Sequence, residues 1–305
     1  MTDTHRPATG TGPAPPTDDV PTPERSTGAG RGLADYAADW EANAQADARY
    51  AILSDPASKG GTWDDDTFMS TGELEIARVL AELDRLGVVV SRTGTCLDFG
   101  CGLGRLTQAL GRRFDQAIGV DVSPTMVAEA TELAAAAGID NVRFALNQQP
   151  HLAQFDTGSI DFVYSNIVLQ HVSSDLQLGY LREFGRLLAP GGLAVVQLPS
   201  RRIGMRGLAR RMTPDALLPL ARRIVRPPAE LEGDGYRIRM EMNCQPEGRI
   251  ADLAVGMDAT IIHIRYTNAA EPAFAGNVDF FDRPTAVSRA RGGGYLSPVY
   301  VIRRR

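Results

Sequence analysis

The composition of this chain limits the kinds of protein it can be. Its 305 residues are 43% hydrophobic and carry a net charge of −5, with a pI near 5.5. A chain of this length can bury a large core, so one domain with additions is the expected plan. The acidic balance argues against a general nucleic-acid binder, because the surface of such a protein is basic. No stretch approaches the roughly 18 apolar residues of a membrane span, so we expect none.

The N-terminal region differs from the rest of the chain. It is rich in Pro, Thr, Gly and Ala and has no aromatic residue in its first 30 positions, which predicts a disordered tail over residues 1–32. It also lacks the apolar stretch of a signal peptide. The chain has three cysteines, and this odd number favours a reducing compartment over a disulfide framework, so we expect a cytoplasmic protein.

Residues 33–92 are predicted to form a helical cap. Four side chains fall near one face of a helix that begins near Leu33: Tyr36, Trp40, Ala44 and Ala51. After a connector, a second helix is expected from Glu73 to about Leu86, with Leu74, Ala77, Leu80 and Leu83 as its inner stripe. Trp63 and Phe68 of the connector either close a site against water or only pin the connector to the core.

A strand, a glycine turn and a helix are predicted within residues 96–107. The apolar residues 88–90 and 95–97 predict a buried parallel strand that ends at Asp98. Three glycines follow at alternate positions: Gly100, Gly102 and Gly104. Such a turn, with a helix from about Arg105, presents bare backbone N–H groups to a ligand. The order Asp-x-Gly-x-Gly-x-Gly differs from the dinucleotide fingerprint Gly-x-Gly-x-x-Gly, since Arg105 takes the place of the third glycine.

A second acidic residue ends the next predicted strand. This strand covers residues 116–121 and closes on Asp121, about 20 residues past the glycines, where a carboxylate can accept hydrogen bonds from both hydroxyls of a ribose. Ser123 and Pro124 then supply an N-cap and a first-turn proline for a helix from Thr125 to Ala137.

These motifs resemble those of the class I S-adenosylmethionine-dependent methyltransferases, and the order of the following segments agrees. Residues 141–146 and 159–166 resemble the third and fourth strands of that family. Residues 181–192 resemble its helix and Pro-Gly-Gly turn before a fifth strand over 193–198. The resemblance covers roughly residues 94–200. It implies an α/β fold, with a Rossmann-like seven-stranded sheet that has helices on both faces.

The resemblance also implies S-adenosylmethionine as the cofactor. The cofactor-binding residues that it implies are Asp98, Gly100, Cys101, Gly102, Gly104, Arg105, Asp121, Val122, Met126, Asn147, Gln148, Ser165 and Asn166. The glycine turn would wrap the methionine part through its backbone, and Asp121 would hold the ribose. Asn147 or Gln148 would read the adenine edge, where the family commonly has an aspartate.

His171 is the candidate catalytic residue. It follows the fourth strand, and imidazole titrates near neutral pH, so it can serve as the base for an oxygen acceptor. The alternative is that His171 only lines the pocket. No group of His, Cys, Asp and Glu has metal-ligand spacing, so we expect no metal.

Residues 201–250 interrupt the sheet pattern. Eight arginines lie within residues 201–226, interleaved with apolar residues, which predicts one or two amphipathic helices. By the resemblance, this insertion is a lid over the acceptor. Its arginines either form a solvated helix face, recognise an anionic acceptor, or contact an anionic membrane surface.

The predicted chain therefore has five parts. They are a disordered tail (1–32), a helical cap (33–92), the S-adenosylmethionine-binding core (93–200), a helical lid (201–250) and the C-terminal end of the core sheet (251–305). The expected function is methyl transfer to a small-molecule acceptor, such as a hydroxyl of a secondary metabolite or sugar. The alternatives are a cofactor-binding protein of this fold without methyl transfer, and a NAD-dependent oxidoreductase.

Overall fold

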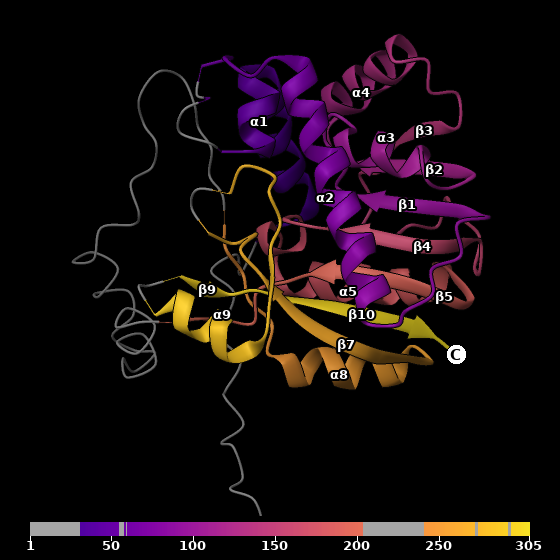
Figure 1. Cartoon of the computed structure of the whole chain (residues 1–305). Coiled ribbons are helices and arrows are strands. Elements are labelled where there is room, and N and C mark those ends of the chain that lie inside the picture. Colours follow the sequence, from indigo (N-terminus) through magenta and orange to yellow (C-terminus); the bar gives the residue numbers. More distant parts are fainter. Residues whose placement is uncertain (1–30, 55–57, 59, 204–240, 272–273, 292–293) are drawn as a thin grey trace, which may run out of the picture.

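A mostly parallel sheet with helices on both faces forms the centre of the protein (Figure 1). The computed structural model describes residues 31–54, 58, 60–203, 241–271, 274–291 and 294–305. The predicted tail, except for its last two residues, and most of the predicted lid lie outside these ranges. The main sheet has the order β3-β2-β1-β4-β5-β10-β7-β8. Its strands are β1 (Thr95–Phe99), β2 (Gln116–Asp121), β3 (Val142–Leu146), β4 (Ile160–Ser165), β5 (Leu188–Gln197), β7 (Ala259–Thr267), β8 (Phe280–Phe281) and β10 (Pro298–Arg304).

The first five strands are parallel, and β10 is inserted beside them in the opposite direction. β1 pairs with β2 and β4, β2 with β3, and β4 with β5, all in parallel. β10 lies between β5 and β7 and is antiparallel to both. This confirms the α/β fold. The described part of the sheet has eight strands rather than seven, because the two-residue β8 adds to the outer edge of β7. β6 (Arg201–Arg202) and β9 (Tyr295–Leu296) form a separate pair.

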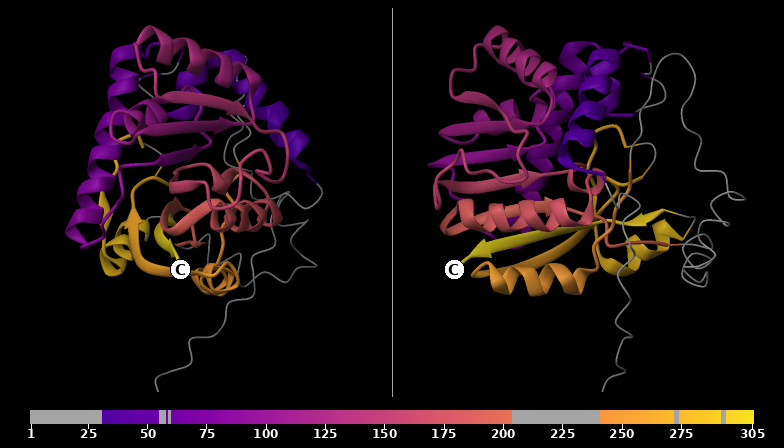
Figure 2. Two further views of the ribbon diagram at one scale, coloured as in Figure 1. Left: turned by 90° about the vertical axis from the view of Figure 1, so that its right-hand side faces the viewer. Right: turned by 180° about the vertical axis from the view of Figure 1, so that it is seen from behind.

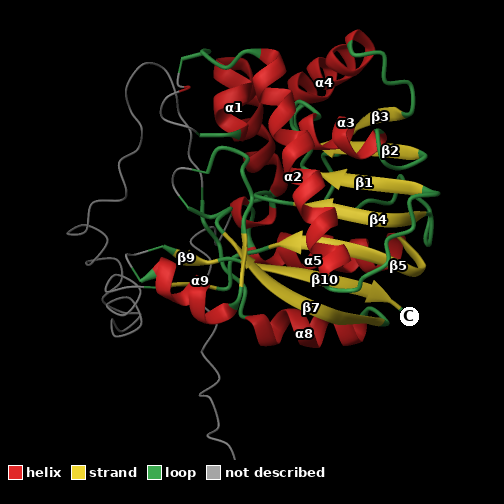
Figure 3. Cartoon of the chain, viewed as in Figure 1, coloured by secondary structure: helices red, strands yellow, loops and turns green. Residues whose placement is uncertain are grey.

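Helices cover the sheet on two sides, as Figures 2 and 3 show. The helices are α1 (Leu33–Ile52), α2 (Asp65–Arg85), α3 (Arg105–Gly111), α4 (Pro124–Ala136), α5 (Ser174–Leu187), α8 (Glu247–Gly256) and α9 (Arg283–Ala290). Side chains alternate along each strand. Cys96 of β1 therefore packs in the cluster that holds α2 and α3, whereas its neighbour Leu97 packs in the cluster that holds α5 and α8.

The second helix begins earlier than predicted and buries a different stripe. Asp64 caps it, because its Oδ1 accepts a hydrogen bond from the Thr67 N–H at 2.8 Å. Residues 65–72 are therefore helix rather than connector. Leu74, predicted to face inward, is 45% exposed, and Ala77 is also exposed. The buried face is instead Phe68, Gly72, Glu75, Ile76, Val79, Leu80 and Leu83. The apolar periodicity was misleading because the acid Glu75 takes one of the buried positions.

Residues 88–90 were also predicted wrongly, since they do not belong to β1. Val89 is 82% exposed. Strand pairing with β2 begins only at Thr95, whose N–H donates to Asp161 at 2.9 Å. Without a neighbouring strand, an apolar run has no partner for its backbone groups. The predicted helix after Ser123 is confirmed, and the Ser123 hydroxyl accepts a hydrogen bond from the Met126 N–H at 3.1 Å.

Candidate active site

The glycine turn lies at the carboxyl end of β1, the edge where open α/β sheets bind ligands. Gly100, Gly102 and Gly104 all have positive φ, at 78°, 51° and 79°. A Cβ on Gly100 would come within 2.3 Å of the Val168 side chain, and one on Gly102 within 2.6 Å of Ile52. Glycine is therefore required here both by backbone conformation and by space.

Asp121, at the end of β2, is tied directly to this turn. Its Oδ2 accepts a hydrogen bond from the Gly102 N–H at 2.8 Å, and its Oδ1 accepts one from the Ser123 N–H at 3.0 Å. Burial raises the pKa of this carboxyl, and the backbone hydrogen bonds oppose the rise. An ionised carboxylate has about four acceptor sites, and the backbone N–H groups do not use all of them, so acceptor capacity remains for a ligand hydroxyl.

A cavity of about 380 Å³ opens beside the turn, a size in the usual range for a small-molecule site. Its wall includes most of the predicted site residues: Gly100, Cys101, Gly102, Arg105, Asp121, Val122, Met126, Asn147, Asn166 and His171. Of the two candidate amides, Asn147 is buried in this wall, whereas Gln148 is exposed and donates to the Val122 carbonyl at 3.2 Å.

Three other predicted residues lie behind the wall and support it. The Asp98 carboxyl accepts a hydrogen bond from Thr107 at 2.7 Å, and burial raises the pKa of Asp98 to about 7. Gly104 precedes α3 as its N-cap. The Ser165 hydroxyl donates to the Phe99 carbonyl at 3.2 Å.

The other half of the cavity is apolar and comes from segments far apart in sequence. Its large side chains are Leu33, Tyr36 and Trp40 at the start of α1, Met242 after the insertion, and Phe274 and Tyr295 near the C-terminus. The sequence predicted the helical cap but did not single out Met242, Phe274 or Tyr295, because no local pattern connects these residues to the site. Trp63 and Phe68 are not in this wall. They contact each other edge-on, with ring centroids 5.8 Å apart, and pack in the core.

His171 is buried in the wall of this cavity. Its Nδ1 lies 2.8 Å from the Glu241 backbone carbonyl, which can only accept, so Nδ1 carries the proton. The Nε2 lone pair then faces the amide nitrogen of Gln170 at 3.2 Å, and Trp40 contacts the ring edge-on. Burial lowers the pKa of His171 to about 4, so the ring is neutral near pH 7.

Sequence reasoning missed Glu75 of α2. Its carboxylate is fully buried and accepts hydrogen bonds from Arg105, Tyr164 and Asn166. A glutamate within a helix ordinarily indicates a solvent-exposed face. No signal short of the tertiary contacts would have placed this residue at the site.

Comparisons with known proteins agree with this geometry. Residues 96–192 match the family described as a methyltransferase domain. The trans-aconitate 2-methyltransferase of Variovorax paradoxus is 36% identical over 108 residues, which cover 35% of this chain and 39% of that protein. The enzyme of that name from Mycobacterium tuberculosis is 34% identical over 158 residues, which cover 49% of this chain and 55% of that protein. This chain carries a class I S-adenosylmethionine-dependent methyltransferase domain. It spans between about two fifths and just over half the length of these curated relatives.

Solved structures support the same fold for the methyltransferase domain. The magnesium protoporphyrin IX methyltransferase of Synechocystis, with bound S-adenosylhomocysteine, has a TM-score of 0.50 at 15% identity and covers 82% of this chain and 92% of that one. The geranyl diphosphate C-methyltransferase of Streptomyces coelicolor has a TM-score of 0.50 at 17% identity and covers 82% of this chain and 88% of that one. At such identities the likeness concerns the fold alone.

The cavity of the methyltransferase domain fits S-adenosylmethionine, the cofactor of this family. The glycine turn leaves no space for side chains, so backbone faces the methionine end. Asp121 has acceptor capacity for ribose hydroxyls, and Val122 and Met126 offer apolar surface for a planar base. Among the described residues, no group of His, Cys, Asp and Glu could hold a metal, and no helix is long and apolar enough to cross a membrane.

Proposed function

We propose that this protein transfers the methyl group of S-adenosylmethionine to an oxygen of a small-molecule acceptor. The observation that carries the proposal is the single cavity that joins the glycine turn to the apolar wall from α1 and the C-terminal segments. The cofactor, when bound, supplies a methyl group already activated by its sulfonium, so placing the acceptor in line provides much of the rate.

Residues of the chain have distinct roles in this proposal. The backbone of Gly100 and Gly102 holds the methionine end, and Asp121 holds the ribose. Asn147 reads the adenine edge from the cavity wall. Asn166, which follows β4, lines the cavity and would lie near the sulfonium of the cofactor. The odd number of cysteines favours a reducing, cytoplasmic setting.

The apolar half of the cavity indicates the kind of acceptor. Tyr36, Trp40, Phe274 and Tyr295 present aromatic surface, and aromatic side chains gain most by burying apolar area of a ligand. We therefore infer a hydroxyl on a largely apolar body, as in many secondary metabolites. A sugar fits this wall less well, since its buried hydroxyl groups would need polar partners.

His171 is the proposed proton acceptor for such a hydroxyl. Its protonated Nδ1 is fixed by the Glu241 carbonyl, so Nε2 carries the lone pair. The Gln170 amide donates to this lone pair at 3.2 Å, so an acceptor hydroxyl would have to take the place of that hydrogen bond. Its lowered pKa keeps this nitrogen unprotonated, although it also makes the base weak.

A carboxylate acceptor is the second candidate. The relatives named trans-aconitate 2-methyltransferase favour it. The low pKa of His171 also agrees, because a carboxylate oxygen is already ionised and needs no base. If the acceptor is a carboxylate, the arginines of the insertion would recognise its negative charge. Of those arginines, the described Arg201 and Arg202 lie in β6, and the other six lie outside the described residues.

The test has two stages. Calorimetric titration with S-adenosylhomocysteine, with NAD and NADH as controls, should show binding of S-adenosylhomocysteine alone. The protein with S-adenosylmethionine is then offered aromatic alcohols and trans-aconitate, and methylated products are detected by mass spectrometry. Binding without any product across the panel would favour a cofactor-binding protein that does not transfer methyl, and binding of NAD alone would overturn the proposal.

Replacing His171 with Asn separates the two acceptors. Turnover of a hydroxyl acceptor should fall by about 10²-fold or more, as for the loss of a general base. Turnover of a carboxylate acceptor should change little. Equal losses on both acceptors, together with weaker cofactor binding, would assign His171 to the pocket wall alone.

A further inference from the structure

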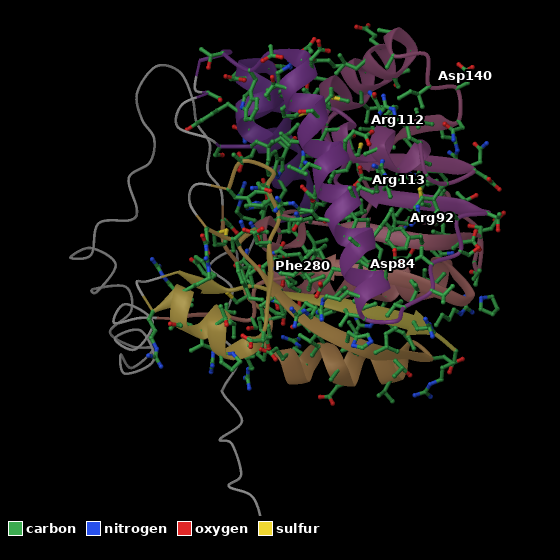
Figure 4. All side chains as sticks on the ribbon, in the orientation of Figure 1. Asp84, Arg92, Arg112, Arg113, Asp140 and Phe280 are labelled. Atoms are coloured by element: carbon green, nitrogen blue, oxygen red, sulfur yellow. The ribbon has the colours of Figure 1, made fainter. Side chains whose placement is uncertain are left out.

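Helix α2, which precedes the segment matched by the methyltransferase family, lies in direct contact with the start of α3. A Cβ on Gly72 would lie 2.1 Å from the Arg105 carbonyl oxygen, so the two backbones touch at this point. Glu73 adds ion pairs from α2 to Arg112 and Arg113, both at 2.6 Å. These two arginines directly follow α3, and Figure 4 labels both of them near α2. The helix that follows the glycine turn is therefore held from outside by α2.

Glu75 lies one turn after Gly72, on the same inward face of α2. Its side chain is fully buried. The Glu75 Oε2 accepts a hydrogen bond from Arg105 Nη1 at 2.9 Å. Its Oε1 accepts one from the Tyr164 hydroxyl and one from Asn166 Nδ2, both at 2.8 Å. One carboxylate thus joins α2 to the start of α3 and to the carboxyl end of β4.

Two of these partners are in the cavity wall. Arg105 and Asn166 both line the cavity, whereas Tyr164 does not. The guanidinium of Arg105 is 4% exposed, and its Nε has no hydrogen-bond partner among the described residues. A buried guanidinium with an unpaired donor depends strongly on the single carboxylate that neutralises it. Loss of the Glu75 charge would therefore release Arg105 and Asn166 together.

We propose that Glu75 is a positioning residue of the cofactor site, which holds Arg105 and Asn166 in the geometry that binds S-adenosylmethionine. Cofactor affinity is then coupled to the docking of α2, a helix outside the matched domain segment. This inference rests on the proposed cofactor function but does not depend on which acceptor is methylated.

The variant E75Q tests this role, with E73Q as its matched control. Glutamine keeps the shape of Glu75 but has one acceptor oxygen and one donor NH₂ group. In either orientation it turns a donor toward Arg105 or toward Asn166. E73Q removes charge from the same helix and from its ion pairs to the two arginines that follow α3, but Glu73 is not among the residues that line the cavity. Both variants are measured at a temperature where circular dichroism shows them folded.

The expected result is a selective loss of cofactor affinity. The dissociation constant of S-adenosylhomocysteine should rise by about tenfold or more in E75Q, equivalent to at least about 1.4 kcal/mol, and by less than about twofold in E73Q. In turnover assays, the KM for S-adenosylmethionine should rise in E75Q while the KM for the acceptor stays unchanged. Y164F removes one donor to Glu75 and keeps its charge, so it should weaken binding by a few-fold.

Two results would overturn the inference. The first is folded E75Q with wild-type affinity, and the second is an equal loss of affinity in E73Q. If E75Q does not fold, Y164F decides, and unchanged affinity in that variant counts against the role. Absence of S-adenosylhomocysteine binding in the wild-type protein would overturn the proposed function as well, so the two failures are distinguishable.

Discussion

The buried, neutral state of His171 should appear in the pH dependence of stability. Its pKa is lowered by burial from 6.5 to about 4. In the unfolded chain the ring is in water and takes up a proton below about pH 6.5. The folded state cannot do so until about pH 4. The unfolded state therefore binds more protons in this window, and the protein loses stability as the pH falls through it.

The size of the effect follows from the two pKa values. At pH 7.5 the ring is neutral in both states and contributes almost nothing to the pH dependence. At pH 5 the unfolded chain gains about 2 kcal/mol from protonating His171, and the folded protein gains almost nothing. His171 alone should therefore lower the free energy of unfolding by about 2 kcal/mol between pH 7.5 and pH 5.

His171→Asn is the perturbation that isolates this effect. The asparagine amide can still donate to the Glu241 carbonyl, as Nδ1 does now at 2.8 Å. The smaller side chain lowers stability at every pH, but it cannot titrate. Urea unfolding of both proteins at pH 7.5 and pH 5 gives the comparison, since all other titrating groups are common to both.

At pH 7.5 the wild type should have the higher free energy of unfolding. At pH 5 its advantage over the variant should be smaller by about 2 kcal/mol, because only the wild type loses stability through His171. Parallel pH profiles for the two proteins would refute the reasoning. They would mean that His171 is solvated, or protonated in the folded state, and that it is not a neutral base in a closed cavity.

Three further results are expected. Asp121→Asn should weaken S-adenosylhomocysteine binding by about 1.5–3 kcal/mol, roughly ten- to a hundredfold, in a calorimetric titration, and unchanged affinity would remove Asp121 from the site. Trp40→Ala should raise the KM for the acceptor by about tenfold and leave the affinity for S-adenosylhomocysteine intact. A loss confined to cofactor binding would contradict the assignment of Trp40 to the acceptor wall. Gly100→Ala and Gly138→Ala should each lower the free energy of unfolding by about 1–2 kcal/mol, because both glycines have a left-handed backbone conformation that alanine adopts with strain. Urea unfolding measures this loss. Only the first should weaken cofactor binding, because its Cβ meets Val168 at 2.3 Å whereas Gly138 has nothing within 4 Å.

Local patterns were sufficient for the central part of the fold. The glycine turn, the acid that ends β2 and the Ser123 cap each depend on residues close together in sequence, and the structure has them where they were predicted. The choice between Asn147 and Gln148 was not local. Adjacent side chains on an extended backbone point in opposite directions, so only the register of β3 with β2 put Asn147 in the wall.

Periodicity failed where tertiary contacts override it. Leu74 fitted an apolar stripe, yet α2 is turned so that Glu75 is buried and Leu74 is half exposed. The reason is that Arg105, Tyr164 and Asn166 together satisfy a carboxylate that no local pattern could have placed inside.

The sequence by itself determined the order of strands and helices through residue 200, and it predicted which residues form the cofactor end of the site. Those features follow from backbone conformation, capping and hydrogen bonding over a few residues. Only the tertiary structure decided what faces the acceptor. Trp40, Met242, Phe274 and Tyr295 are separated by tens to hundreds of residues. They share one wall because β10 pairs antiparallel with β5, β7 pairs with β10, and α1 packs over the strand ends. The free energy that brings them together is burial of apolar surface, which is non-directional, so local spacing along the chain does not indicate which distant segments will meet.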